Sequence, residues 1–202
     1  MKHRIVSRKK NAFLNTSSTI ILQAVTGICG LILPRLLISV FGSEVNGLCA
    51  SITQFLGYIS LLQAGVEGVF RASLYRPLSE NDVNKISGIV NDAKGFYRKI
   101  ALIFIPYVLG LCIFYPIFVE SSYDKIYLSS LVLILSIGTF LQYFFSLAYV
   151  SLISADQKIR VINYLDSIVI ILNLAVTIAL IKLGLGIHIV KIGSCLVFAI
   201  KP

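Results

Sequence analysis

Four charged side chains lie inside or at the edge of long apolar stretches of the chain: Arg35, Glu67, Asp166 and Lys191. A charge at the centre of a membrane helix costs about 2.5 to 3.5 kcal/mol on insertion scales, so such a charge needs a partner, a ligand or access to the lipid headgroups. Glu67 has a partner in the sequence, because Arg71 follows one helical turn later. For the other three, snorkelling or a structural ion pair is the alternative to a functional role.

Arg35 and Lys191 are the candidates for binding an anionic ligand. Pro34 removes a backbone donor beside Arg35 and weakens the helix there, and Gly27 and Gly30 precede it by a turn or two. A bend beside a cation suits the wall of a cavity. Two cations that converge on one cavity would select an anion such as a phosphate.

Uncharged polar side chains within the apolar stretches form a second group of candidates. They are Gln23, Gln54, Gln63, Gln142, Asn163 and Asn173. Each can line the same cavity or form a hydrogen bond between helices. We take Gln23 and Asn163 as candidate ligand-binding residues, and Asp166 as the candidate for coupling to an ion.

The sequence contains no motif for nucleotide binding or hydrolysis, so the chain does not look like an ATPase or a hydrolase. Its four cysteines fall in separate apolar stretches, and His3 and His188 are isolated. The sequence therefore predicts no metal site, no cofactor and no catalytic residue. If the chain needs energy to move a ligand, that energy must come from an ion gradient, the membrane potential or the ligand's own concentration gradient.

These residues are embedded in a chain with the composition of a membrane protein. Hydrophobic residues make up 57% and charged residues 13%, with a mean hydropathy of +0.89. Soluble domains have about 45 to 50% apolar and about 25% charged residues. We predict an all-α, polytopic bundle of six transmembrane helices in one domain covering residues 1–202. The predicted helices cover residues 14–41, 46–70, 100–119, 127–154, 161–181 and 187–200.

The basic residues predict the orientation of this bundle. Thirteen of the 18 lie in the N-terminal segment and in the connections after the second and fourth helices, whereas the alternate connections hold only Lys125 and Lys182. The positive-inside rule then places both termini in the cytoplasm. We expect the bundle itself to lie in the cell membrane. The net charge of +9 sits at helix ends and forms no solvent-facing stripe, so we expect no nucleic-acid partner.

The connection after the second helix predicts an amphipathic cytoplasmic helix over residues 79–99. Ser79 and Asp82 have the spacing of a capping box. Apolar residues then recur every three or four positions: Val83, Ile86, Val90, Ala93, Tyr97 and Ile100. Such a helix either lies in the headgroup region or simply connects two spans.

Three segments carry a resemblance to a known family. They are SRKKN at residues 7–11, PRLLISVFGSEVNGL at 34–48 and LLQAGVEGVFRASLYRPLSENDVNKI at 61–86. Together they resemble the N-terminal half of Wzx-type flippases for polysaccharide lipids, in the superfamily of multidrug, oligosaccharidyl-lipid and polysaccharide exporters. The resemblance implies a transporter, not an enzyme, that moves undecaprenyl-pyrophosphate-linked glycans to the outer leaflet by alternating access.

In such proteins two helical bundles surround a central cavity, and Arg35 resembles a basic residue that faces this cavity. The residues from Ala199 to Pro202 resemble the start of the segment that leads into the second bundle. We therefore expect the chain to be one lobe, completed by a C-terminal lobe or a second copy, with membrane lipid and a lipid-linked glycan as partners. The alternatives are a small-molecule or cation exporter of the same superfamily, a non-transporting membrane subunit, and an inert fragment.

Overall fold

The computed structural model describes residues 2–63 and 65–199, with side chains from residue 11 onward. Every regular element in these ranges is a helix, which confirms the predicted all-α class. In chain order the elements are α1 (Lys2–Gly57), the 3₁₀-helix η1 (Tyr58–Gln63), α2 (Val66–Glu80), α3 (Val83–Phe118), α4 (Lys125–Leu141), the π-helix η2 (Gln142–Ser146), α5 (Leu147–Ala155), α6 (Ile159–Lys182) and α7 (Ile187–Ala199). Ile200, the predicted end of the last helix, and Pro202 lie outside the described residues.

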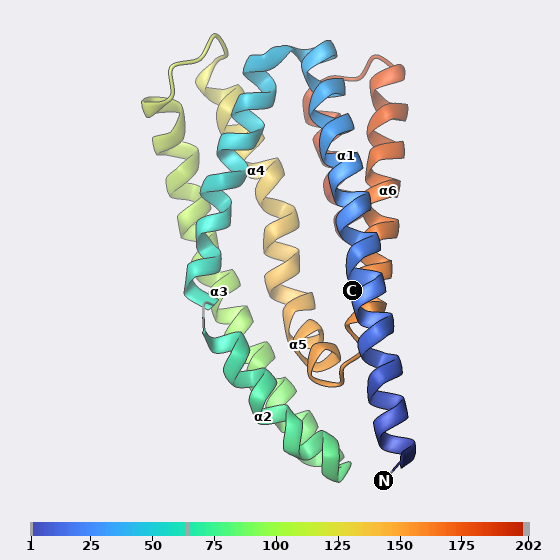
Figure 1. The fold of residues 1–202 in the computed structure, drawn as a ribbon. Helices are drawn as coiled ribbons and strands as arrows, with labels where there is room; N and C mark the ends of the chain where they lie inside the picture. The colour runs from blue at the N-terminus through green and yellow to red at the C-terminus, as the bar shows by residue number, and fades with distance from the viewer. Residues whose placement is uncertain (1, 64, 200–202) are drawn as a thin grey trace.

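The long element α1 consists of two arms that meet at Gly42. This glycine has φ 87° and ψ 164°, a combination that only glycine adopts without strain. The first arm, residues 11–41, rises along the molecule, and the second arm, residues 43–57, turns across the top and descends (Figure 1). The predicted boundary between the first two helices therefore lies where the sequence placed it.

The predicted second helix, residues 46–70, is wrong as a single helix. Its α-helical part ends at Gly57, the 3₁₀-helix η1 follows, and Gly65 with φ 86° precedes α2. A glycine at each end of this segment tolerates the change of backbone conformation that other residues resist. The descending segment formed by the second arm of α1, η1 and α2 is therefore interrupted near its middle.

The predicted fourth helix, residues 127–154, has its expected extent but contains a π turn. α4 continues directly into η2 and then α5 without a gap in the helix. Within η2 the Leu147 N–H donates to the Gln142 carbonyl, five residues earlier. This hydrogen-bond pattern is rare and occurs mostly as a single turn inserted in an α-helix.

The predicted start of the amphipathic helix at Ser79 is also wrong. α2 continues to Glu80, and the Ser79 hydroxyl donates to the Arg76 carbonyl. Asp82 is the N-cap of α3, because its carboxylate accepts a 3.1 Å hydrogen bond from the Lys85 backbone N–H. The hydrogen bond from the Lys85 side chain, followed by the one from the Lys85 backbone N–H, holds the pKa of the Asp82 carboxyl below its ordinary value.

α3 is one continuous helix, not an amphipathic helix followed by a separate span. The predicted apolar face is largely confirmed, since Val90, Ala93, Tyr97 and Ile100 are buried, whereas Val83 is 72% exposed. α3 as a whole packs against α2, α4, η2 and α5. The spacing of apolar residues therefore predicted the buried face of this helix correctly. The N-cap at Asp82 shows that the helix begins later than predicted.

Within the part of the chain that the structure describes, four helical segments are long and apolar enough to cross a membrane, the character of a membrane protein. They are Asn11–Gln63, Val83–Phe118, Lys125–Ala155 and Ile159–Lys182. The first of them includes both arms of α1. α7 has 13 residues, fewer than the roughly 20 that a full crossing needs, so the count of six membrane spans stays a prediction.

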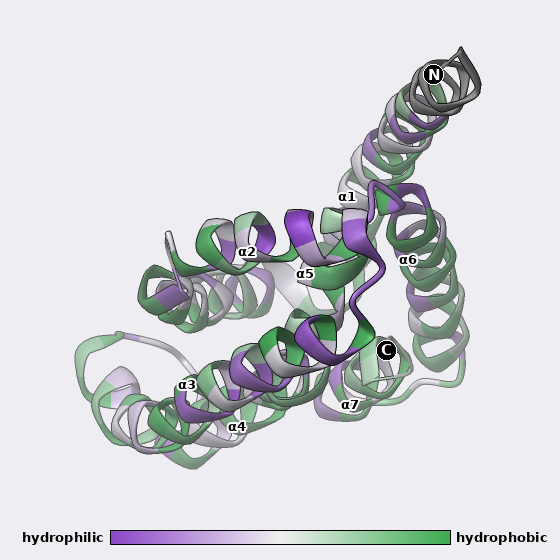
Figure 2. Cartoon of the chain, turned by 90° about the horizontal axis from the view of Figure 1, so that it is seen from below, coloured by the Kyte–Doolittle hydropathy of each residue, from purple (hydrophilic) through white to green (hydrophobic). Residues whose placement is uncertain are grey.

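Two groups of helices flank an interior space. Seen from below, the first arm of α1 stands against α6, while α2, α3, α4 and α5 form the other side and α7 packs against both α6 and α4 (Figure 2). The main core lies between the second arm of α1, α3 and α4, around Ile52, Phe104 and Leu131. Large apolar side chains such as Leu31 and Phe118 are exposed on the outside, as expected of a lipid-facing surface.

Candidate functional site: a polar groove at Lys191

Three cavities with shared wall residues lie in the interior of the helix bundle, and we call them together the polar groove. The first, about 710 Å³, lies between the two arms of α1 and α7. The second, about 760 Å³, lies between α4, η2, α6 and α7, and the third, about 270 Å³, between η1 and η2. Thr53 lines all three cavities, and Lys191 lines the first two.

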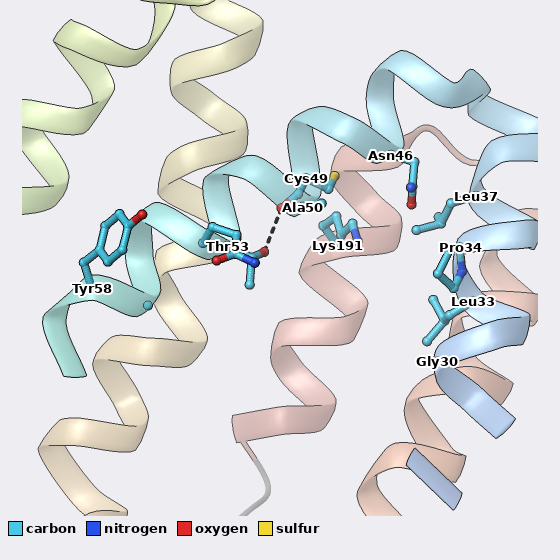
Figure 3. A pocket seen from close by; sticks show the side chains of 12 residues that line it. Gly30, Leu33, Pro34, Leu37, Asn46, Cys49, Ala50, Thr53, Tyr58 and Lys191 are labelled. Atoms are coloured by element: carbon cyan, nitrogen blue, oxygen red, sulfur yellow. Dashed lines mark hydrogen bonds between the residues drawn. The ribbon is translucent and has the colours of Figure 1, made fainter. Parts of the chain in front are cut away.

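Lys191 is the cation of this groove within the described residues. It is partly buried on α7, and Figure 3 shows its side chain between Cys49 and Ala50 of the second arm and Leu37 of the first. The described side chains form four salt bridges, and Lys191 takes part in none of them. An ammonium group in this position is available to an anion that enters the groove.

The walls of the groove differ in polarity. Toward the first arm of α1 the wall consists of Gly30, Leu33, Pro34 and Leu37. Elsewhere polar side chains are frequent: Asn46, Thr53, Gln54, Ser60, Gln63, Thr139, Gln142, Ser146, Asn173 and Ser194. The groove therefore offers an apolar side and a polar side to one ligand, with the ammonium group of Lys191 between them.

Both irregular helical segments face this groove. The third cavity lies between η1, which contributes Ile59, Ser60 and Gln63, and η2, which contributes Gln142 and Tyr143. Irregular backbone at membrane depth occurs where it is buried in protein or lines a cavity, because lipid cannot satisfy its polar groups. The two irregular helical segments therefore lie where this rule requires, beside a cavity.

The structure separates the two predicted cations. Arg35 is exposed and lines none of these three cavities, although its neighbour Pro34 lines the first. Lys191 lies in the groove as described above. In this conformation the two side chains therefore do not converge on one site.

The remaining predicted site residues lie outside the groove. Gln23 is exposed on α1, and Asp166 is partly buried on α6. Asn163 is buried, and its side-chain amide donates to Ser18 Oγ at 3.0 Å and Thr19 Oγ1 at 2.9 Å. These bonds hold α6 against α1, which accounts for Asn163 without a ligand.

Four members of the wider polar set line the groove instead: Gln54, Gln63, Gln142 and Asn173. Asn46, Thr53, Thr139 and Ser194 also line the groove but were not predicted to do so. Threonine and serine are common in membrane helices and bond to their own backbone, so their presence there does not indicate a ligand site. Thr53 forms such a bond here, with its hydroxyl donating to the Cys49 carbonyl at 2.7 Å. Four of the six amide side chains within apolar stretches thus line the groove, whereas Gln23 and Asn163 do not.

Glu67 and His188, two further side chains considered in the sequence, each have a partner in the structure. Glu67 and Arg71 form the predicted pair, with 2.5 Å between Oε1 and Nη2. His188 Nε2 lies 2.8 Å from Ser130 Oγ, and its ring meets the edge of Tyr127. Among the described residues, no three His, Cys, Asp or Glu side chains are grouped in a way that would hold a metal ion.

Comparison with known proteins gives no match to a family model, to a curated protein or to a solved structure. The groove and its residues therefore carry the functional argument alone.

Proposed function

We propose that the chain is one lobe of a transporter that binds the anionic headgroup of a lipid-linked glycan in the polar groove and passes it across the cell membrane. The observation that carries this proposal is Lys191, a partly buried ammonium group with no salt bridge among the described side chains. A charge held in an apolar environment is costly, and a phosphate ligand would compensate that cost.

The two kinds of wall support an amphiphilic ligand. A lipid chain would lie along the apolar wall formed by Gly30, Leu33 and Leu37. The polar headgroup would extend from Lys191 into the second cavity, toward Gln142 and Asn173. No bond of the substrate is broken in this scheme, so the function is binding and movement.

The orientation that we propose follows from the basic residues. In Figure 1 the start of α1, the α2–α3 turn and the α5–α6 turn lie toward one end, and the turn between the two arms of α1 and the loop after α3 lie at the other. The first end carries the basic segments and would face the cytoplasm. A cysteine placed at Ser122 should react with a membrane-impermeant reagent from outside and one at Asn81 should not; the reverse pattern would invert the orientation.

Alternating access would require a second wall opposite the groove. A second lobe or a second copy of this chain would supply it, and Arg35, exposed beside the first cavity, would then face the ligand from the rim. The alternative of a cation exporter would rely on a carboxylate in the binding cavity. Asp166 lines none of the three cavities of the groove, which favours the anionic ligand.

Binding of farnesyl diphosphate, with farnesol as the uncharged counterpart, tests the proposed anion site. Lys191→Met should weaken binding of the diphosphate by roughly ten- to a hundredfold, the value of a charge-assisted hydrogen bond, and leave farnesol binding unchanged. Lys191→Arg should retain most of the affinity, and Lys182→Met, at the exposed end of α6, is the matched control. Equal diphosphate binding by wild type and Lys191→Met would refute the proposal.

A further inference from the structure

Asn173 is a buried side chain in the second cavity whose hydrogen bonds are not satisfied within the described part of the chain. It is 6% exposed, and its Oδ1 is buried without a hydrogen-bond partner. The other buried polar side chains of α6 all have partners: Asn163 bonds to Ser18 and Thr19, Ser167 to the Asn163 carbonyl, and Thr177 to Ser194. A buried amide without a partner is costly, so its presence calls for a partner that binds.

Asn173 lines the same cavity as the cation of the groove. Thr177 follows it by one turn on the same face of α6, and its hydroxyl lies 3.4 Å from Ser194 Oγ on α7. Lys191 lies one turn before Ser194 on α7, and Asn173, Ser194 and Lys191 all line the second cavity. An anion at Lys191 therefore has the Asn173 carboxamide in the same cavity.

We infer that Asn173 is a specificity residue: it binds a hydroxyl- or amide-bearing ring attached to the anion held by Lys191, and so distinguishes a sugar phosphate from a bare phosphate ester. A carboxamide offers both donors and an acceptor. A phosphate at neutral pH offers acceptors only, so it can pair with Lys191 but cannot donate to Asn173 Oδ1. A sugar ring supplies the missing donor, and a cavity of about 760 Å³ is of the size that small-molecule sites have.

This inference rests on the proposed anion site, and the experiment separates the two. Glucose 1-phosphate and cyclohexyl phosphate have the same phosphate ester and a ring of the same size, but only the sugar ring carries hydroxyl groups. Both compete with labelled farnesyl diphosphate for the detergent-solubilised chain. Wild type should prefer glucose 1-phosphate by about tenfold, the value of a hydrogen bond to a buried group that otherwise lacks one.

Asn173→Leu keeps the branched shape and the number of heavy atoms of the side chain and removes its hydrogen-bonding groups. It should abolish the preference and leave competition by cyclohexyl phosphate unchanged. Asn163→Leu, on the same helix but outside the groove, should keep the preference and controls for loss of a buried amide. Lys191→Met should weaken both competitors alike.

The outcomes distinguish the two proposals. A wild-type chain without preference for the sugar refutes the inference, and this measurement requires no variant to fold. A preference that survives in Asn173→Leu also refutes it, while the anion site stands. Failure of both phosphates to compete in wild type refutes the anion site and, with it, the role of Asn173.

Discussion

Replacement of Gly42 by alanine should destabilise the fold without creating any steric clash. A Cβ atom at Gly42 would meet nothing within 4 Å, so the only cost is the backbone conformation at φ 87° and ψ 164°. Conformations of this kind cost about 1 to 3 kcal/mol for residues other than glycine. Because about 1.4 kcal/mol is a factor of ten, the ratio of folded to unfolded protein should fall by roughly five- to 150-fold.

Gly27→Ala is the matched control, since Gly27 lies within the first arm of α1 and also has open space around its Cβ position. Alanine within a helix stabilises it by about 0.5 to 1 kcal/mol relative to glycine, so this variant should be at least as stable as wild type. A thiol-reactive dye can follow unfolding in detergent, because Cys29, Cys49 and Cys195 are buried and react only when the bundle opens.

The two variants must therefore shift the midpoint of dye labelling in opposite directions, or Gly42→Ala alone must lower it. If Gly42→Ala unfolds together with wild type, the turn between the two arms does not have the conformation described, and the reasoning fails.

Further predictions concern residues at and around the groove. Asn163→Leu should lower stability by about 1 kcal/mol, as for other hydrogen bonds between membrane helices, and unchanged unfolding would show that its bonds to α1 contribute nothing. Because the pKa of Asp82 is lowered in the folded protein, the ionised carboxylate stabilises the start of α3 fully above the unfolded pKa of about 3.9. This stabilisation should be lost as the pH falls through the lower, folded pKa. Faster amide exchange at Lys85 should report the loss. Asp82→Ala should lose the same protection at neutral pH; protection independent of both changes would exclude the cap. If the proposed function holds and a second wall faces the groove, Arg35→Ala should abolish glycan export and Arg35→Lys should retain part of it; full export by Arg35→Ala at normal protein levels would exclude a role for this residue.

The sequence predicted where most helices lie because apolar length reports directly on membrane helices. Apolar spacing also predicted the packing face of α3, down to Tyr97 and Ile100. The irregular segments η1 and η2 were not predicted. Mean hydropathy does not depend on whether a backbone N–H bonds to the carbonyl three, four or five residues earlier. Gly57 and Gly65, on either side of η1, were the visible signal.

Prediction of the groove residues was less complete for a different reason. Lys191 and Arg35 look alike in the sequence, each a cation in the outer part of an apolar stretch. The direction in which each side chain points depends on the rotation of its helix against neighbours far away in sequence. Asn163 and Asn173 lie ten positions apart on one helix, yet one bonds to α1 and the other lines the groove.

The π turn at η2 has a consequence for changes in the length of the chain. Deleting a residue within an ordinary helix rotates everything beyond it by about 100°, which would turn the buried Ser151 and Ala155 of α5 away from their neighbours. Deleting one residue within η2 would instead convert the turn to a regular α-helix and leave both flanking faces in register. The helix thus carries one surplus residue at the groove between Gln142 and Ser146. A deletion there would change the shape of the groove while leaving the framework of the bundle intact.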